Sequence, residues 1–412
     1  MRQKMKFGGG LFPPPQGNFP QSYPGIGFGG GGGPQGLILP SFELPFADLG
    51  NGVVSTVEIR VGMTPTFVRA TAGWTRKSDL SWVGVASGSP RSYWTRLGVY
   101  AGYLVEPQRQ NRCLHSRDLT NAAWVAVNVT TAKTQTGIDG VVNSCSLLTA
   151  SLDAGTLLQT VVSASATRSY SAHIKRSVGT GTLEMTVDGV TWTAVTSSVG
   201  VGVFGLCQIT QAAVTNPIMG FRIGTAGDAF VIDMCQEETG AKASTPIPTT
   251  VAAVTRDADN LRYTLGASFN AVEGSLAAAI TDISGNATVG RAALSLDDGT
   301  TNERIFTLIA TSRRMQFTTV DGGATQAQVS PADTITADVP FKVSTSYKLN
   351  DFTGYLSGQA GTPDTAGTLP TVTTLVVGGL ITTPTNLLEG CIKDLRYYNR
   401  RLSNSQLQAL TA

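Results

Sequence analysis

Paired carboxylates are the first groups in this 412-residue chain that could do chemistry. Glycoside hydrolysis needs two carboxyl groups several ångströms apart on a sugar-binding groove. Neighbouring acids occur at Asp257 with Asp259, at Glu237 with Glu238, and at Asp297 with Asp298. Each pair stands in a turn or at a strand edge, where solvated carboxylates are common. We therefore expect no catalytic residue among them.

The two histidines, His115 and His173, also lack a catalytic setting. Neither belongs to a H-E-x-x-H metal motif, and the chain has no G-x-S-x-G nucleophile elbow. His173 lies in the alternating stretch "SYSAHIKR", which predicts an ordinary strand position. The glycine run "GFGGGGG" has no strand before it and no helix after it, so it is not a phosphate-binding loop. We expect a protein that is not an enzyme and needs no cofactor.

Two turns in the last third of the chain combine polar groups with aromatic rings, as sugar recognition requires. They are "SLDDGTTNER" and "KLNDFTGYL", and both also predict plain hairpin turns. The predicted glycan-binding residues are Asp297, Asp298, Asn302, Asn350, Asp351 and Tyr355, with Phe352 as a second ring. The first turn, with Glu303, has oxygen atoms that would suit calcium. Its spacing is not that of an EF-hand, and we predict no metal site.

Strands must position these turns, because the composition favours β-structure. Charged residues make up only 14%, and Thr, Ser and Gly take their place. Residues 113–250 predict a first β unit, with an Asp-Gly turn at 188–189 and a return strand over 190–194. The expected inward positions are Leu183, Met185, Val187, Phe230, Ile232 and Met234. Short strands at this spacing are typical of a sandwich or jelly roll.

The segment "STPIPTT" (244–250) predicts a domain boundary, because two prolines in three residues stop strand pairing. Residues 251–412 predict a second β unit with hairpins over 303–323 and 342–358, the latter turned at Asn350-Asp351. The chain ends in a predicted short helix. Ser403 and Gln406 have capping-box spacing, and Leu402 with Leu407 would form the hydrophobic staple.

The N-terminal residues differ in composition from the rest. Residues 1–50 predict an extended Gly/Pro-rich arm, which carries spaced aromatics that could order against a partner surface. The proposed anchors are Phe7, Phe12, Phe19, Tyr23 and Phe28. A disordered tail is the alternative. Residues 51–112 carry eight Lys or Arg against three acids and three Trp, which predicts a basic, aromatic β collar or linker and a candidate protein interface.

Charge and cysteine content limit the remaining possibilities. The net charge of +2 implies no general attraction to nucleic acid. No apolar run approaches a membrane span, and no secretory signal is recognisable. The five cysteines are far apart and odd in number, so we expect buried thiols in a protein assembled in a reducing cytoplasm.

Three stretches resemble known families. "GYLVEPQRQN" (102–111) followed by "SRDLTNAAW" (116–124) is similar to a segment of bacteriophage virion proteins, although Gln110 and Cys113 stand where Thr and Leu are common. Residues 220–250 resemble the last strands of the carbohydrate-binding-module-like jelly roll of those proteins. Residues 389–412 resemble the closing strand and helix of a concanavalin A-like, laminin-G-like domain. The first 100 residues resemble no family.

The resemblance implies an all-β protein with two consecutive lectin-like sandwiches after the arm. It further implies a structural component of a tailed-phage particle, assembled in the host cytoplasm. We expect a short tail fibre or receptor-binding adhesin that contacts host surface glycans. A head fibre or capsid decoration protein is one alternative, and a glycan-cleaving tailspike is another. Expected partners are the tail hub, tail tube or capsid through the arm, and two further copies in a homotrimer, with no nucleic acid and no membrane insertion.

Overall fold

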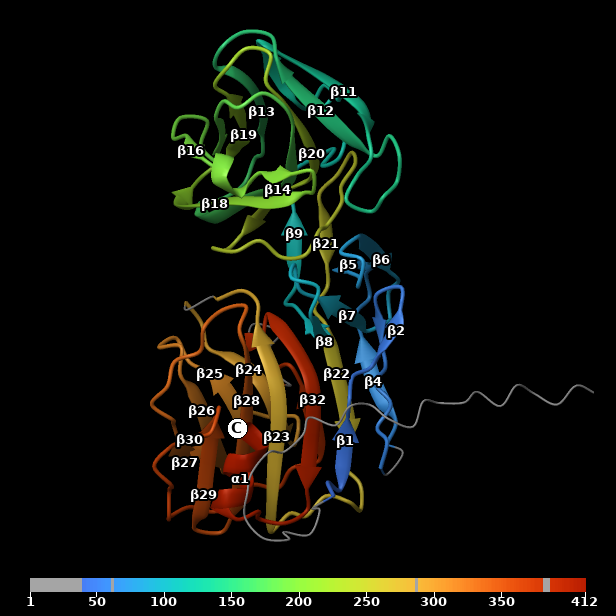
Figure 1. Cartoon of the computed structure of the whole chain (residues 1–412). Coiled ribbons are helices and arrows are strands. Elements are labelled where there is room, and N and C mark those ends of the chain that lie inside the picture. Colours follow the sequence, from blue (N-terminus) through green and yellow to red (C-terminus); the bar gives the residue numbers. More distant parts are fainter. Residues whose placement is uncertain (1–38, 61–62, 286–287, 381–385) are drawn as a thin grey trace, which may run out of the picture. The chain divides into compact units, whose positions relative to one another are not determined.

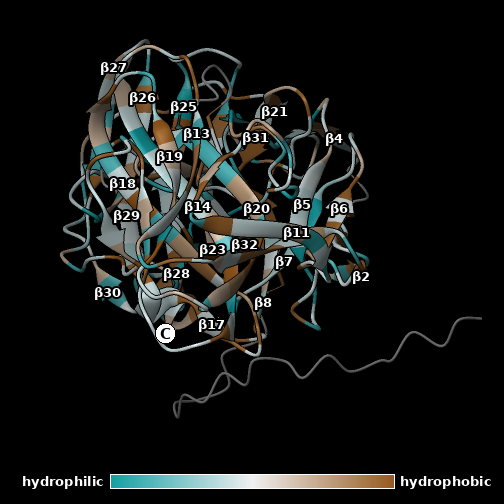
Figure 2. Ribbon diagram, turned by 90° about the horizontal axis from the view of Figure 1, so that it is seen from above, coloured by the Kyte–Doolittle hydropathy of each residue, from teal (hydrophilic) through white to brown (hydrophobic). Residues whose placement is uncertain are grey.

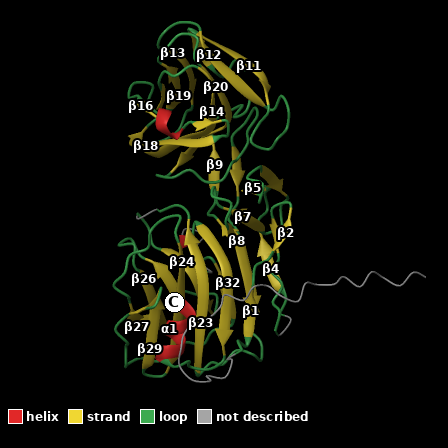
Figure 3. Cartoon of the chain, in the orientation of Figure 1, coloured by secondary structure: helices red, strands yellow, loops and turns green. Residues whose placement is uncertain are grey.

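The computed structural model describes residues 39–60, 63–285, 288–380 and 386–412. The described chain is all-β, as predicted, with many strands and little helix (Figure 3). The five expected anchor residues of the arm, Phe7, Phe12, Phe19, Tyr23 and Phe28, lie outside the described residues. Residues 39–412 form one compact unit of the chain.

The first sandwich, here the jelly-roll unit, is built from residues 113–250 and has two sheets (Figure 1). The six-stranded sheet contains β11 (Val129–Gln135), β12 (Cys145–Ala150), β20 (Ala229–Thr239), β14 (Ala166–Val178), β17 (Gly200–Val201) and β18 (Gly205–Val214). The five-stranded sheet has the order β10 (Val125–Val127), β13 (Gly155–Thr160), β19 (Ile218–Ile223), β15 (Leu183–Thr186) and β16 (Thr193–Ala194). A 3-10 turn, η1 (Thr196–Ser198), follows β16. The alternating pattern of the sequence therefore predicted the class of this unit correctly.

The 183–194 hairpin of the jelly-roll unit forms, but its return strand begins late. Leu183 and Met185 are buried in the core as predicted. The carboxylate of Asp188 accepts hydrogen bonds from the backbone N–H groups of Val190 and Thr191, at 2.8 and 2.7 Å. These bonds widen the turn, so pairing resumes only at Thr193 and leaves Val190 81% exposed. The predicted return strand over 190–194 is therefore too long, since Val190 and Trp192 lie before β16.

Strand β20 departs from simple alternation at Met234. Phe230 and Ile232 lie in the jelly-roll core as predicted. The pairing of β20 with β14 shifts register here, and Met234 has a φ of +53°. This bulge turns Met234 away from the core into a separate cluster with Trp82, and Cys235 enters the core instead. The prediction that Met234 shares the face of Phe230 is wrong for that reason.

The second sandwich, here the C-terminal sandwich, has a ten-stranded and a seven-stranded sheet. The larger sheet contains β2 (Asp48–Gly50), β3 (Val53–Val54), β7 (Arg91–Trp94), β8 (Tyr100–Val105), β32 (Gly390–Tyr398), β23 (Glu273–Asp282), β28 (Pro340–Lys348), β29 (Asp351–Leu356) and β30 (Gln359–Ala360), with β1 (Phe42–Leu44) paired to β32. The smaller sheet has the order β27 (Ala324–Val329), β26 (Met315–Asp321), β25 (Arg304–Ile309), β24 (Arg291–Asp297), β31 (Thr374–Val377), β22 (Asn260–Thr264) and β4 (Pro65–Val68). Apolar and polar segments alternate along strands such as β25 and β26 (Figure 2).

Six of the strands between residues 42 and 105, β1 to β4, β7 and β8, belong to this C-terminal sandwich. Strand β8 pairs with β32, and β4 pairs with β22, so both sheets take strands from the early chain. Phe42, Leu44 and Tyr103 lie in the same core as Leu395. We expected an arm ending at residue 50 and a separate collar over 51–112. The structure differs because β1, β4 and β8 pair with strands more than 190 residues later. Two small sheets remain outside the sandwich sheets: β5 (Gly73–Arg76) with β6 (Trp82–Val85), and β9 (Arg109–Asn111) with β21 (Val254–Arg256).

The predicted hairpins of this sandwich form. Strands β25 and β26 pair as expected, and β28 pairs with β29. The second turn lies one residue earlier than predicted, at Leu349-Asn350, because Lys348 pairs with Asp351. Asn350 adopts a φ of +56°, a conformation that Asn tolerates.

The C-terminal helix α1 (Asn404–Thr411) begins as the sequence predicts. The Ser403 hydroxyl accepts from the Gln406 N–H at 3.3 Å, and the Gln406 side chain accepts from the Ser403 N–H at 2.9 Å. Leu402 and Leu407 are both buried. In the part of the chain that the structure describes, no helix has the length and apolarity needed to cross a membrane.

Candidate functional site

The motif "GYLVEPQRQN" builds a buried ion network rather than a surface site. One oxygen of the Glu106 carboxylate lies 2.8 Å from Arg91 and 3.0 Å from Arg256, and the other accepts the Thr245 N–H at 2.8 Å. Burial alone would raise the pKa of Glu106, but Arg256 and Arg91 outweigh it and lower the pKa to about 2. The network therefore holds the Pro-rich exit of the jelly-roll unit against the C-terminal sandwich.

Asn111 and Arg117, in the same pair of motifs, also have structural roles. The Asn111 amide donates to the carbonyls of Cys235 and Ile247, at 3.0 and 2.7 Å, and accepts from two backbone N–H groups. Arg117 binds Asp139 and Asp233, each with a contact of 2.8 Å. These motifs explain how the jelly-roll unit closes, not what it binds.

The three carboxylate pairs are each held by partners within the protein. Asp259 is fully buried between Arg69 and Arg91. Glu237 lies 3.3 Å from Arg112 and 3.4 Å from Arg168. The remaining acids have fewer charged partners: Glu238 binds Ser244, and Asp257 accepts from Gln108 at 3.0 Å. Burial raises the pKa of Glu237 and of Glu238. The arrangement of these residues is that of structural carboxylates.

His173 is buried in β14, as a strand position predicts. Neither ring nitrogen has a hydrogen-bond partner among the described residues. The ring packs edge-on against Trp82, with centroids 5.4 Å apart. Burial, with a smaller effect from the charge of Arg76, lowers the pKa of His173 to about 3. The neutral imidazole therefore acts as an apolar packing group.

The first predicted glycan turn forms a compact loop after β24. The Asp297 carboxylate is buried and accepts from the Ser295 hydroxyl at 2.7 Å; burial raises its pKa. Asp298 is half-buried and accepts the Thr300 N–H and hydroxyl, both at 2.8 Å. Asn302 is exposed. Of these three predicted residues, Asn302 is the one with a fully exposed side chain.

The second predicted turn lies beside the first because segment 364–373 connects them. At one end, the Gly367 N–H donates to the Asn350 side chain at 3.0 Å. At the other end, the Thr373 N–H donates to the Asp297 carbonyl at 2.9 Å. Asp351 forms a two-pronged pair with Arg401, at 3.0 and 2.9 Å. The two turns therefore form one loop cluster, which the sequence alone did not predict.

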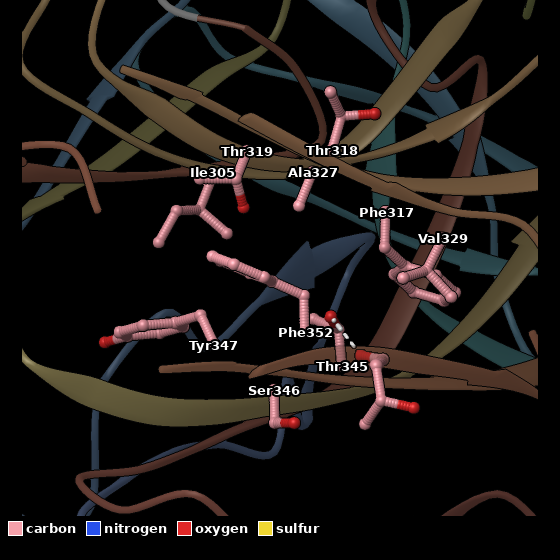
Figure 4. Close-up of a pocket in the computed structure, with 11 residues that line it drawn as sticks. Ile305, Phe317, Thr318, Thr319, Ala327, Val329, Thr345, Ser346, Tyr347 and Phe352 are labelled. Atoms are coloured by element: carbon pink, nitrogen blue, oxygen red, sulfur yellow. Dashed lines mark hydrogen bonds between the residues drawn. The ribbon is translucent and has the colours of Figure 1, made fainter. Parts of the chain in front are cut away.

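The aromatic rings expected in this loop cluster are not accessible. Phe352 and Tyr355 are both buried, at 3% and 6% exposure. Phe352 points into the interior between the two sheets, next to Phe317 and Tyr347 (Figure 4). The expectation that Tyr355 or Phe352 offers a ring to a sugar is therefore wrong. Phe352 faces the core between the sheets, and Tyr355, three residues later, lies buried on the opposite face of β29, a strand that α1 contacts.

The cavities of the C-terminal sandwich are too small for a sugar. The one drawn in Figure 4 has a volume of about 10 Å³ and is lined by core rings and by hydroxyls such as Thr345 and Ser346. That is room for about one water molecule. A pocket of about 110 Å³ opens beside Asn260 and Arg262, below the ~300 Å³ at which small-molecule sites begin. A sugar ring would need an open surface in place of either of these two cavities.

Such a surface exists on the outer face of the five-stranded sheet of the jelly-roll unit. Glu184 and Arg222 are cross-strand partners on β15 and β19, and Trp192 stands just before β16, whose Ala194 pairs with Glu184. The Arg222 guanidinium lies over the Trp192 ring, 4.7 Å from its centroid. Arg222 Nε also donates to Glu184 at 2.5 Å. Trp192 is half-buried, so part of its ring remains at the surface.

This Trp192 face (Trp192, Arg222, Glu184) is geometrically fixed. The hydrogen bond to Glu184, together with the carboxylate charge, raises the pKa of Arg222. The guanidinium is thus held in place by a carboxylate and an aromatic ring at once. We did not predict this face, since Trp192 was assigned to the return strand and not to a binding site. The sequence did contain the Asp-Gly turn. The widening of this turn by the Asp188 hydrogen bonds is what places Trp192 before the strand.

Among the described residues, no group of three His, Cys, Asp or Glu side chains is placed to hold a metal ion. All five cysteines are buried and unpaired, consistent with the expected free thiols.

Comparisons with known proteins give no family. No protein-family profile matches the chain, and no curated protein matches it. Solved structures that are similar include the CBM40 module of a Ruminococcus gnavus IT-sialidase bound to α2,3-sialyllactose, with 16% identity, 35% of this chain and 84% of that chain covered, and a TM-score of 0.31. The NanB sialidase of Streptococcus pneumoniae matches with 14% identity, 34% and 24% coverage, and a TM-score of 0.31. The heptameric SAP-like pentraxin of Limulus polyphemus matches with 12% identity, 36% and 72% coverage, and a TM-score of 0.28. The site assignment therefore depends on the geometry of this chain itself.

Proposed function

We propose that this chain is a non-enzymatic attachment protein of a tailed-phage particle, a short tail fibre or receptor-binding adhesin, which binds a surface glycan through the Trp192 face. The observation that carries the proposal is the half-exposed Trp192 ring next to the paired Arg222 and Glu184. Sugars present an apolar C–H face and a rim of hydroxyls. An aromatic ring matches the first, and planar charged groups match the second.

The remaining parts of the chain support a role in attachment. The Gly/Pro-rich residues 1–36 contain spaced aromatics on a chain that is costly to order, as expected of a peptide that orders on a partner. Shallow sugar sites bind weakly, and three copies on one particle would raise the apparent affinity by about 10²–10⁴. A homotrimer that joins the particle through its arm is therefore part of the proposal.

Binding of the labelled full-length protein to an array of bacterial surface polysaccharides tests this function. We expect binding to at least one polysaccharide, lost after periodate oxidation of its sugars and reduced at least about tenfold in Trp192→Ala. Trp94→Ala is the matched control, because Trp94 is also half-buried but lies on β7 of the C-terminal sandwich. Equal binding by native protein and Trp192→Ala would contradict the assigned face. Absence of any glycan binding by a protein that joins particles would favour the decoration alternative.

A further inference from the structure

We infer that the Trp192 face selects neutral glycans and excludes acidic ones. The inference rests on the proposed function and adds the class of ligand. Three observations support it: the charged residues present on the outer face of the five-stranded sheet, the ion pair between Arg222 and Glu184 on that face, and the apolar residues around this pair.

The register of the five strands defines which side chains share this face. One row across the sheet contains Val127, Thr156, Arg222, Glu184 and Ala194. The next contains Val125, Leu158, Gly220 and Thr186. Trp192 stands just before β16, with Arg222 over its ring. Arg222 and Glu184 are the charged members of these two rows, and Asp188 adds a carboxylate 3.1 Å from the Thr186 hydroxyl, so the face carries no excess positive charge.

The single cation of the face is already neutralised. Arg222 Nε lies 2.5 Å from a Glu184 oxygen, and both side chains are partly exposed, at 32% and 21%. A ligand carboxylate or phosphate placed on the Arg222 amino groups would approach the Glu184 carboxylate as well. That like-charge contact opposes the attraction to Arg222. A hydroxyl has no such conflict, since it can accept from Arg222 and donate to Glu184 at the same time.

The surroundings of the pair suit the C–H faces of a sugar chain. Val125 and Val127 on edge strand β10 are 62% and 53% exposed, and Leu158 on β13 is half-buried between them and the Gly220 position. No side chain rises from Gly220, and Leu158 leans across its place. With strands about 4.8 Å apart, five strands give a strip about 19 Å wide. An extended oligosaccharide lying across the strands would use this strip from Trp192 to Val125.

Calorimetry with defined hexasaccharides and the full-length protein tests the ligand class. The neutral probes are cellohexaose, maltohexaose and the N-acetylglucosamine hexamer; the acidic probes are the galacturonate hexamer and the hyaluronan hexasaccharide. We expect at least one neutral probe to bind about tenfold or more tightly than either acidic probe. Its Kd should change less than about twofold between about 50 mM and about 500 mM NaCl, because no ion pair with the ligand is formed.

Preference for an acidic probe, or a strongly salt-dependent Kd, would overturn the inference and leave the proposed glycan binding intact. Binding of no neutral probe by a protein that binds polysaccharide on the array would also overturn it. Neutral binding that persists unchanged in Trp192→Ala would instead overturn the proposed site. These outcomes separate failure of the ligand class from failure of the function.

Substitution of Glu184 gives a second readout. Glu184→Gln keeps a hydrogen-bonding side chain but frees the charge of Arg222, so the galacturonate hexamer should gain about tenfold in affinity, with a salt-dependent Kd. The affinity for the neutral probes should change by less than this tenfold gain. The control is Glu273→Gln, which removes the carboxylate from a surface pair with Lys348 in the C-terminal sandwich. No gain of acidic binding in Glu184→Gln would mean that the pair does not set the ligand class.

Discussion

The guanidinium of Arg91 lies 2.8 Å from the carboxylate of Glu106, and the Arg91 side chain has no exposed surface. The same arginine binds Asp259, so its charge is shared between two carboxylates. Removing one partner of a buried pair leaves an uncompensated charge. Glu106→Gln should therefore lower the free energy of unfolding by about 3–5 kcal/mol in urea titrations.

Glu273→Gln serves as the control for that substitution. Its partner Lys348 is half exposed, at 54% for the side chain, and exposed pairs contribute little. The unfolding free energy should change by no more than about 0.5 kcal/mol. Comparable losses in the two variants would show that the buried network is not what stabilises the junction.

Gly102 explains why the recognised motif begins with glycine. Its φ is +101°, and a Cβ built there would lie 2.2 Å from the Ile392 carbonyl oxygen. Gly102→Ala should lower the free energy of unfolding by about 3 kcal/mol or more, because backbone strain and a clash with β32 add together. Gly88→Ala is the matched control: its φ is +69°, but no heavy atom lies within 4 Å of the added Cβ. It should cost only about 1 kcal/mol in the same urea assay.

His173 should make stability depend on pH. Its pKa falls from 6.5 to about 3 on folding, so the neutral ring is favoured in the native state. The stability that this preference adds to the native state is fully present above the pKa of the unfolded state, and it is lost as pH falls from 6.5 toward 3. Between about pH 7.5 and about pH 4.5, the free energy of unfolding of the native protein should therefore fall by about 2–3 kcal/mol more than that of His173→Phe. An apolar ring costs no hydrogen bond here, since neither nitrogen has a partner among the described residues.

Urea midpoints at the two pH values give this difference, and other titrating groups cancel between the two proteins. Identical pH dependence in native protein and His173→Phe would contradict the assignment.

The loop cluster and the Trp192 face make different predictions for glycan binding. Asp298→Ala and Asp351→Ala should bind polysaccharide as well as native protein, because both carboxylates serve internal contacts and the nearby rings are buried. Trp192→Ala should not. Loss of binding in Asp298→Ala, with normal unfolding, would return the site to the turns that the sequence indicated.

Deletion of residues 2–36 tests the arm. Residues 39–412 contain both hydrophobic cores, so the truncated protein should unfold at the same urea concentration as the full chain. It should fail to join particles. Incorporation of the truncated protein at the normal level would rule out the arm as the attachment peptide.

Sedimentation of the full chain should give a trimer at micromolar concentration, and a stable monomer would count against that part of the proposal.

The sequence by itself determined the features that depend on neighbouring residues. Alternation predicted strands β25, β26 and β28, and the capping box from Ser403 predicted the start of α1. These signals are local: a side chain's direction along a strand and the satisfaction of a helix's first N–H groups need only a few residues. The all-β class followed from them.

Tertiary structure alone decided which strands share a sheet and which side chains reach the surface. Arg69 and Asp259, 190 residues apart, meet in one buried pair, and strands such as β4 and β8 from the early chain complete the C-terminal sandwich. A strand's hydrogen-bonding edge accepts any partner of suitable register, so the choice depends on the packing of the whole core. The same packing buries Tyr355, whereas the widened turn at Asp188 leaves Trp192 at the surface beside Arg222.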